Sequence, residues 1–239
     1  MGQLNAALAI LSTAVAACGA AELRRSAGEA GPDYTTESTA WRVAGDAPEP
    51  VRQRLTAAVR RGARAGGTSL ELDGRLSELA GWVLGEITRV DARSDERADL
   101  LAGSAVDHEA WRLGLVAPTP SLLVQAHTTL EGLEAKLASE RLSAQLSRRP
   151  THMGLAVTEH RGTHLAVLVF VRRDLTLEAL PRHIEPGQLR LRGRLREGVH
   201  GPVLAITGPD GRVRTARLPE TRGLDFAFLL RARGAHQLE

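Results

Sequence analysis

Three histidines are the residues whose chemistry could support a catalytic site in this chain. His127, His152 and His164 lie in or beside segments that we expect to be strands of one sheet, so the fold could bring their imidazoles together. A hydrolytic site needs such a base beside a nucleophile, and a metal site needs three or four ligands around one ion. The three are the candidate catalytic residues if the chain is an enzyme.

The spacing of the reactive groups matches no recognised motif. His160 and His164 would lie across a hairpin loop, and not one helical turn apart as in zinc-binding helices. Ser104, Ser121 and Ser139 lie outside any Gly-x-Ser-x-Gly elbow. We therefore predict a non-catalytic protein without a metal or cofactor, and keep as the alternative a hydrolase with a rebuilt site that contains histidine.

The only cysteine follows an apolar opening segment that is too short to span a bilayer. Val15-Ala16-Ala17-Cys18 resembles the lipobox of bacterial lipoproteins. The resemblance implies a signal peptide over residues 1–18, lipidation of Cys18, and a bacterial cell-envelope location in the outer membrane or periplasm. Met1-Gly2-Gln3 contains no lysine or arginine, unlike most signal peptides. The alternative is therefore a buried N-terminal helix with a packed free cysteine.

Composition favours a globular protein that does not bind nucleic acid. The 239 residues are 43% hydrophobic and 3% aromatic, with a formal net charge of +3. A nucleic-acid interface usually gathers basic residues on one face, with aromatic side chains to stack on bases, whereas the arginines here alternate with acidic residues. Residues 19–50 are rich in small and polar residues and have no apolar period, which predicts a flexible tether.

Apolar spacing after residue 50 predicts helices that surround a sheet. Asp73 is placed to cap one helix, and Thr128 and Glu131 have the spacing of a capping box. The strand that ends in Val171 is apolar on both faces, so helices should cover both sides of the sheet. The expected helices span residues 51–59, 72–87, 100–115 and 130–146, and the expected strands span 122–127, 153–159 and 164–171.

Two runs in this region resemble a known family. "LELDGRLSELAGWVL" and "RRPTHMGLAVTEHRGTHLAVLVFV" resemble a helix and two strands of the CAP superfamily, which comprises cysteine-rich secretory proteins, antigen 5 and pathogenesis-related proteins. The resemblance implies an α+β fold, a three-layer α-β-α sandwich with a mainly antiparallel sheet, over residues 51–173. With the following β-rich module, it also resembles secreted proteins of myxobacteria-like organisms.

The family's cleft carries two histidines and two glutamates, and the resemblance implies that this chain has lost them. The resemblance puts the first histidine position near Ala58 and the second near Val83, and no Gly-Glu-Asn segment supplies a glutamate. The resemblance therefore implies a degenerate cleft that binds a protein, a glycan or an apolar ligand without metal chemistry.

Residues 174–239 alternate in a pattern typical of a small all-β module, whose last strand is short or cut at the end of the sequence. An edge strand is expected over 174–181, and further strands over 189–195, 203–207, 213–218 and 224–230. Arg190, Arg192, Arg194 and Arg196 would share one outer face and contact an anionic partner, or simply be solvated. Glu197 or a neighbouring strand should offset these charges.

Overall fold

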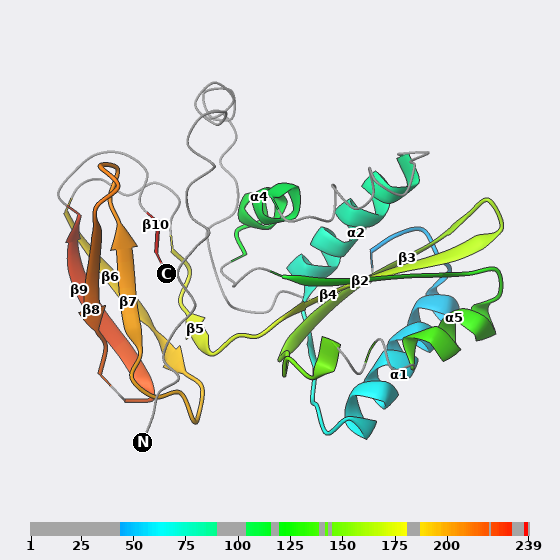
Figure 1. Ribbon diagram of the computed structural model, residues 1–239, viewed down its shortest axis with the longest axis horizontal. Coiled ribbons are helices and arrows are strands. Elements are labelled where there is room, and N and C mark those ends of the chain that lie inside the picture. Colours follow the sequence, from blue (N-terminus) through cyan, green and yellow to red (C-terminus); the bar gives the residue numbers. More distant parts are fainter. Residues whose placement is uncertain are drawn as a thin grey trace, which may run out of the picture. The chain divides into compact units, whose positions relative to one another are not determined.

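The computed structural model describes residues 44–89, 104–115, 120–138, 142, 145–180, 187–219, 221–230 and 237–238. It has the predicted α+β class: a three-layer α-β-α sandwich with a mainly antiparallel sheet, followed by a small all-β module (Figure 1). Cys18 and most of the predicted tether lie outside the described residues.

The sheet of the sandwich has the strand order β1-β3-β4-β2. The short strand β1 (Glu71–Leu72) runs parallel to β3 (His152–His160). The strands β4 (Thr163–Val171) and β2 (Ser121–His127) complete it with antiparallel pairing. The predicted hairpin between β3 and β4 turns through Arg161 and Gly162, both with positive φ (50° and 72°). Such a two-residue turn matches the twist of the two strands and fixes their register.

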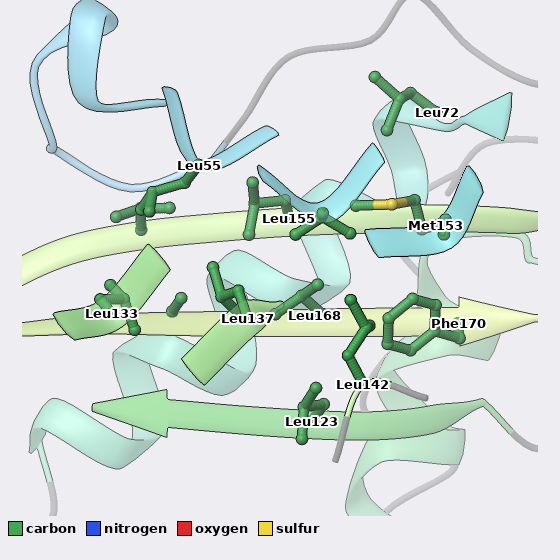
Figure 2. Packing of buried hydrophobic residues seen from close by; sticks show 14 of the residues in the cluster. Leu55, Leu72, Leu123, Leu133, Leu137, Leu142, Met153, Leu155, Leu168 and Phe170 are labelled. Carbon is green, nitrogen blue, oxygen red and sulfur yellow. The ribbon is translucent and has the colours of Figure 1, made fainter. Parts of the chain in front are cut away.

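One face of the sheet packs against α1 (Glu49–Ala65) and α5 (Leu130–Leu137). Leu55 and Leu133 come from these helices and meet Leu155, Leu168 and Phe170, which point out of the same face of the sheet (Figure 2). Cross-strand pairing places Leu155 directly opposite Leu168. This apolar layer accounts for one half of the sandwich core.

The other face packs against α2 (Gly74–Arg89) and α4 (Ser104–Arg112). Val167, Val169 and Val171 alternate with the residues of the first face, so β4 is buried on both sides as its sequence predicted. Gly154 allows α2 to approach closely, because a Cβ there would lie 2.0 Å from the backbone of Leu76.

The edge of β3 holds residues that we expected to belong to the tether. Ala44 forms an isolated parallel bridge with Ala156, and its backbone N–H donates to the carbonyl of Leu155 at 3.1 Å. Ala47 is buried, and α1 begins at Glu49. The tether predicted over 19–50 therefore extends too far, because these residues gain backbone hydrogen bonds to a sheet edge.

The predicted N-cap is correct for α2 and wrong for α5. Asp73 Oδ1 accepts a hydrogen bond from the Leu76 N–H at 3.0 Å, which confirms the predicted cap of α2. The cap of α5 is Thr129, whose side chain accepts from Gly132 N, and not Thr128 of the predicted capping box. That helix ends at Leu137, short of the predicted residue 146, although Leu142 and Leu146 still join the same core.

Two three-stranded sheets form the β module. One has the order β5-β6-β9, with β5 (Leu175–Leu177) at its edge as predicted, β6 (Gly187–Leu195) and β9 (Gly223–Leu230). The other has the order β10-β7-β8, with β10 (Gln237–Leu238), β7 (Val203–Thr207) and β8 (Val213–Arg217). Side chains from both, such as Leu191, Leu204 and Ile206, form a separate core. Within the described ranges, none of the helices combines the length and apolar character that a membrane crossing requires.

Candidate functional site

The imidazole of His127 is held by the start of α5. Its Nδ1 accepts a hydrogen bond from the backbone N–H of Thr129 at 3.0 Å, so that nitrogen carries no proton. The ring lies over Gly132, where an added Cβ would come within 2.0 Å of it. One imidazole nitrogen is thus committed to positioning the helix, which leaves only Nε2 for other chemistry.

His164 is the direct cross-strand neighbour of His127. The register pairs His127 of β2 with His164 of β4, and His164 with Glu159 of β3, so the three side chains form a row on one face of the sheet. The His164 Nδ1 lies 3.9 Å from the Glu159 carboxylate, within reach of an ion pair when the ring is protonated. Two of the three predicted histidines are therefore brought together.

Two glutamates of α5, Glu131 and Glu134, form hydrogen-bonded ion pairs with Arg54 of α1. Arg54 donates to Glu134 at 2.9 Å and to Glu131 at 3.2 Å. A backbone hydrogen bond lowers the pKa of the Glu131 carboxyl, and Arg54 lowers it further. Glu131 is thus ionised at neutral pH and paired with a cation, a state that does not suit a general acid.

His152 lies far from the other two candidates. It is at the start of β3, paired with Val171, whereas Glu159, the neighbour of His164, lies seven residues further along the same strand. At roughly 3.3 Å per residue the separation is about 23 Å. No single substrate group could contact all three histidines.

The surroundings of His152 hold it neutral. Thr151 Oγ1 accepts the Arg173 N–H at 2.9 Å and lies 2.7 Å from His152 Nδ1. The Glu71 carboxylate can only accept, so in the neutral ring the proton is on Nε2, and Nδ1 accepts a hydrogen bond from the Thr151 hydroxyl. The His152 Nε2–H then faces Glu71 at 3.3 Å. Burial, and next the positive charge of Arg173, lower the pKa of the imidazole, with Glu71 acting in the opposite direction.

A buried ion pair beside His152 was not predicted from the sequence. Arg173 Nη1 donates to Asp73 Oδ2 at 2.7 Å, and the two side chains are 2% and 0% exposed. The guanidinium Nε and Nη2 have no hydrogen-bond partner within the described part of the chain. Asp73 was recognised only as a helix cap. The available signal was a pair of arginines, Arg172 and Arg173, that follows the most apolar strand.

The two positions that the CAP resemblance assigns to histidines lie apart in the fold. Ala58 is buried in α1 and Val83 in α2. These helices cover opposite faces of the sheet (Figure 1). The register taken from the sequence therefore does not place the two positions in one cleft.

The outer face of β6 carries the predicted row of arginines, and acidic residues offset most of it. Arg190 donates to both carboxylate oxygens of Asp225 on β9, at 2.5 and 2.6 Å. This contact raises the pKa of Arg190 and lowers that of Asp225. Arg192 lies 3.8 Å from Asp225, and Arg196 lies 4.0 Å from Asp174. The neighbouring strand supplies the predicted acidic partner for Arg190 and Arg192, whereas Glu197 pairs with Arg222.

Arg194 differs from the other arginines of the row. Among the described residues it has no ion pair, and its side chain lines an open pocket of about 410 Å³ with Leu195, Glu197, Arg222 and Gly223. Of the four arginines predicted to contact an anionic partner, this one lines a concave surface with its charge uncompensated.

Comparison with protein families and with curated proteins gives no relative of this chain. None of the protein-family models matches the chain, and the curated proteins include no match. The described ranges contain no group of three or more histidine, cysteine, aspartate or glutamate side chains that could hold a metal ion. The functional assignment therefore depends on the geometry of the chain itself.

Proposed function

We propose that this protein is a non-catalytic binding or scaffolding module of a bacterial cell envelope, attached to the membrane by a lipid on Cys18. The main support for a non-catalytic role is that the three candidate histidines do not lie together. His152 lies about 23 Å along β3 from the row formed by His127 and His164.

Two of these histidines, His127 and His152, also have a structural role that competes with catalysis. His127 accepts a backbone hydrogen bond at the start of α5, and His152 is joined through Thr151 to the chain at Arg173. A general base must present a free nitrogen to a substrate proton. The contacts of His127 and His152 use the Nδ1 lone pair in both cases.

A CAP-like sandwich is part of the same proposal. The α-β-α layers and the mainly antiparallel sheet agree with what the resemblance implies for residues 51–173. Ala58 and Val83, at the positions assigned to the family's histidines, have no group that binds metal. The sandwich acts in this proposal as a scaffold from which the following β module is presented.

The envelope part can be tested by fractionation in a bacterial host. The full chain should pellet with membranes, and Cys18→Ser should move to the soluble fraction, because serine cannot accept the thioether-linked lipid. Ser12→Ala, a change in the same opening segment, is the matched control and should stay with the membranes. Equal distribution of the wild type and Cys18→Ser would exclude the lipid anchor.

A hydrolase is the second candidate, favoured by the row of His127, His164 and Glu159. The chromogenic ester 4-nitrophenyl acetate can probe it. We expect turnover by the full chain to equal that of His164→Ala, since His164 is not a general base in the proposed function. A large loss of turnover in His164→Ala, with His160→Ala unchanged, would favour the hydrolase and contradict the non-catalytic role.

A further inference from the structure

The pocket beside Arg194 is built on paired backbone at one end of the sheet β5-β6-β9. Arg194 lies directly opposite Gly223 in the register of β6 and β9. The Leu195 N–H donates to the carbonyl of Arg222 at 2.9 Å, which ties together the two segments that line the pocket. The lining side chains are therefore attached to a backbone held by hydrogen bonds.

The charges in this pocket leave one arginine uncompensated. Glu197 and Arg222 form an ion pair at 2.9 Å, and both side chains are exposed. Arg194 has no ion pair or hydrogen-bond partner for its side chain in the part of the chain that the structure describes. Arg190, on the same strand and face, is held by both oxygens of Asp225. The pocket thus carries a net positive charge at one defined side chain.

We propose that this pocket binds the carboxylate or phosphate of a sugar-sized acid, with Arg194 as the residue that recognises the anion. A guanidinium presents paired N–H donors whose geometry matches the two oxygens of such a group. Arg222 adds a second guanidinium, and the Glu197 carboxylate accepts hydrogen bonds from ligand hydroxyls. A volume of about 410 Å³ lies within the range of small-molecule sites.

The same charges favour a small acid over an anionic membrane. A lipid surface attracts many cationic side chains together, each contributing about 1 kcal/mol. Asp225 neutralises the Arg190 guanidinium on this face, and Glu178 adds a further negative charge near it. One uncompensated arginine inside a pocket suits a ligand with one anionic group.

This site deepens the proposed binding function and can be tested separately from it. Galacturonate and galactose are the probes, since they differ mainly in a carboxylate that replaces a hydroxymethyl group. Calorimetric titration of the full chain should detect galacturonate binding and no galactose binding. Arg194→Gln should weaken galacturonate binding by about fivefold or more, because it removes the charge and the paired donors.

Matched variants separate the site from general charge. Arg190→Gln lies on the same strand and face but removes an arginine that Asp225 already neutralises, so binding should change by less than about twofold. Arg194→Lys keeps the charge without the planar fork, and its affinity should fall between those of the wild type and Arg194→Gln. Circular dichroism shows whether Arg194→Gln folds. If it does not, the proposal is tested by the galacturonate affinities of the other two variants. Arg194→Lys should bind more weakly than Arg190→Gln.

Four outcomes would overturn the proposal. The first is equal binding of galactose and galacturonate, and the second is an equal loss in Arg190→Gln and Arg194→Gln. The third is absence of sugar binding together with Arg194-dependent sedimentation on phosphatidylglycerol vesicles, which would make the surface a membrane contact. The fourth, a chain that is lipidated on Cys18 yet binds no galacturonate, would keep the envelope role and lose this site.

Discussion

At the scale of single residues, the ion pair of Asp73 and Arg173 joins two parts of the sandwich that are 100 residues apart in the sequence. Asp73 caps α2 through Oδ1 and binds the guanidinium through Oδ2, and Arg173 follows the end of β4. Both side chains are almost completely buried. Removing one partner leaves the other charge without compensation in the interior, which costs more than the intact pair contributes.

Arg173→Met should therefore destabilise the protein by about 3–5 kcal/mol. Asp73→Asn keeps a side chain that caps helices well and removes only the charge, so it should also destabilise strongly. The double variant should be more stable than the sum of the two losses predicts, because it buries no unpaired charge. Urea unfolding measures all three, and simple additivity would show that the two side chains do not interact.

His152 predicts a dependence of stability on pH. Burial and Arg173 lower its pKa in the folded chain, so the unfolded chain binds a proton first as the pH falls. Stability should decrease as the pH drops below about 6.5, the ordinary histidine value, towards the lower folded pKa. His152→Gln should flatten this part of the curve in urea unfolding between pH 7.5 and pH 5. An unchanged slope would assign the effect to another group.

At the scale of elements, the close approach of α2 to the sheet depends on a glycine in β3. Gly154→Ala would place a Cβ 2.0 Å from the backbone of Leu76. Since backbone cannot rotate away, we expect a loss of about 1–3 kcal/mol or more in the free energy of unfolding. Gly85→Ala, in α2 itself, is the matched control.

The control variant Gly85→Ala should increase the free energy of unfolding by up to about 1 kcal/mol. Its Cβ meets nothing within 4 Å, and alanine favours the helix more than glycine does. Thermal unfolding of both variants provides the comparison. A neutral Gly154→Ala would mean that α2 and β3 separate more easily than the packing indicates.

The elements themselves were largely predictable, because their signals are local. The strand from His164 to Val171 is apolar at every position but the first, which predicted helices on both of its faces, and α1, α5, α2 and α4 cover them. The ends of helices were less certain. Leu142 and Leu146 follow the helical period of Leu133 and Leu137, yet α5 ends at Leu137. The helical spacing of these leucines correctly indicated that they share one core, but it did not indicate where the helix ends.

The candidate site was harder to predict, because long-range pairing decides it. Alternation placed Arg190 and Arg194 on one face, but only the register of β6 with β9 puts Asp225 beside the first and Gly223 opposite the second. Long-range pairing also decides the positions of His127 and His152. His127 is the last residue of β2 and His152 is the first residue of β3, and the two strands run in the same direction, so the two side chains lie at opposite ends of the sheet.

At the scale of the whole molecule, the chain combines two cores of different kinds. The sandwich has an apolar layer on each face of its sheet, and the β module has a smaller core between two sheets. In the sandwich, His127 and His152 make structural contacts. The β module carries a positively charged pocket at its surface. In the proposed function, the sandwich is the support and the β module is the part that binds.

The proposed lipid anchor is tested most directly by mass spectrometry of the N-terminal peptide of the protein from its native host, with membrane and soluble fractions analysed separately. We expect a mature chain in the membrane fraction that begins at Cys18 and carries the mass of a diacylglyceryl group. An intact chain that still begins at Met1, with an unmodified Cys18, would contradict the lipid anchor and the envelope role.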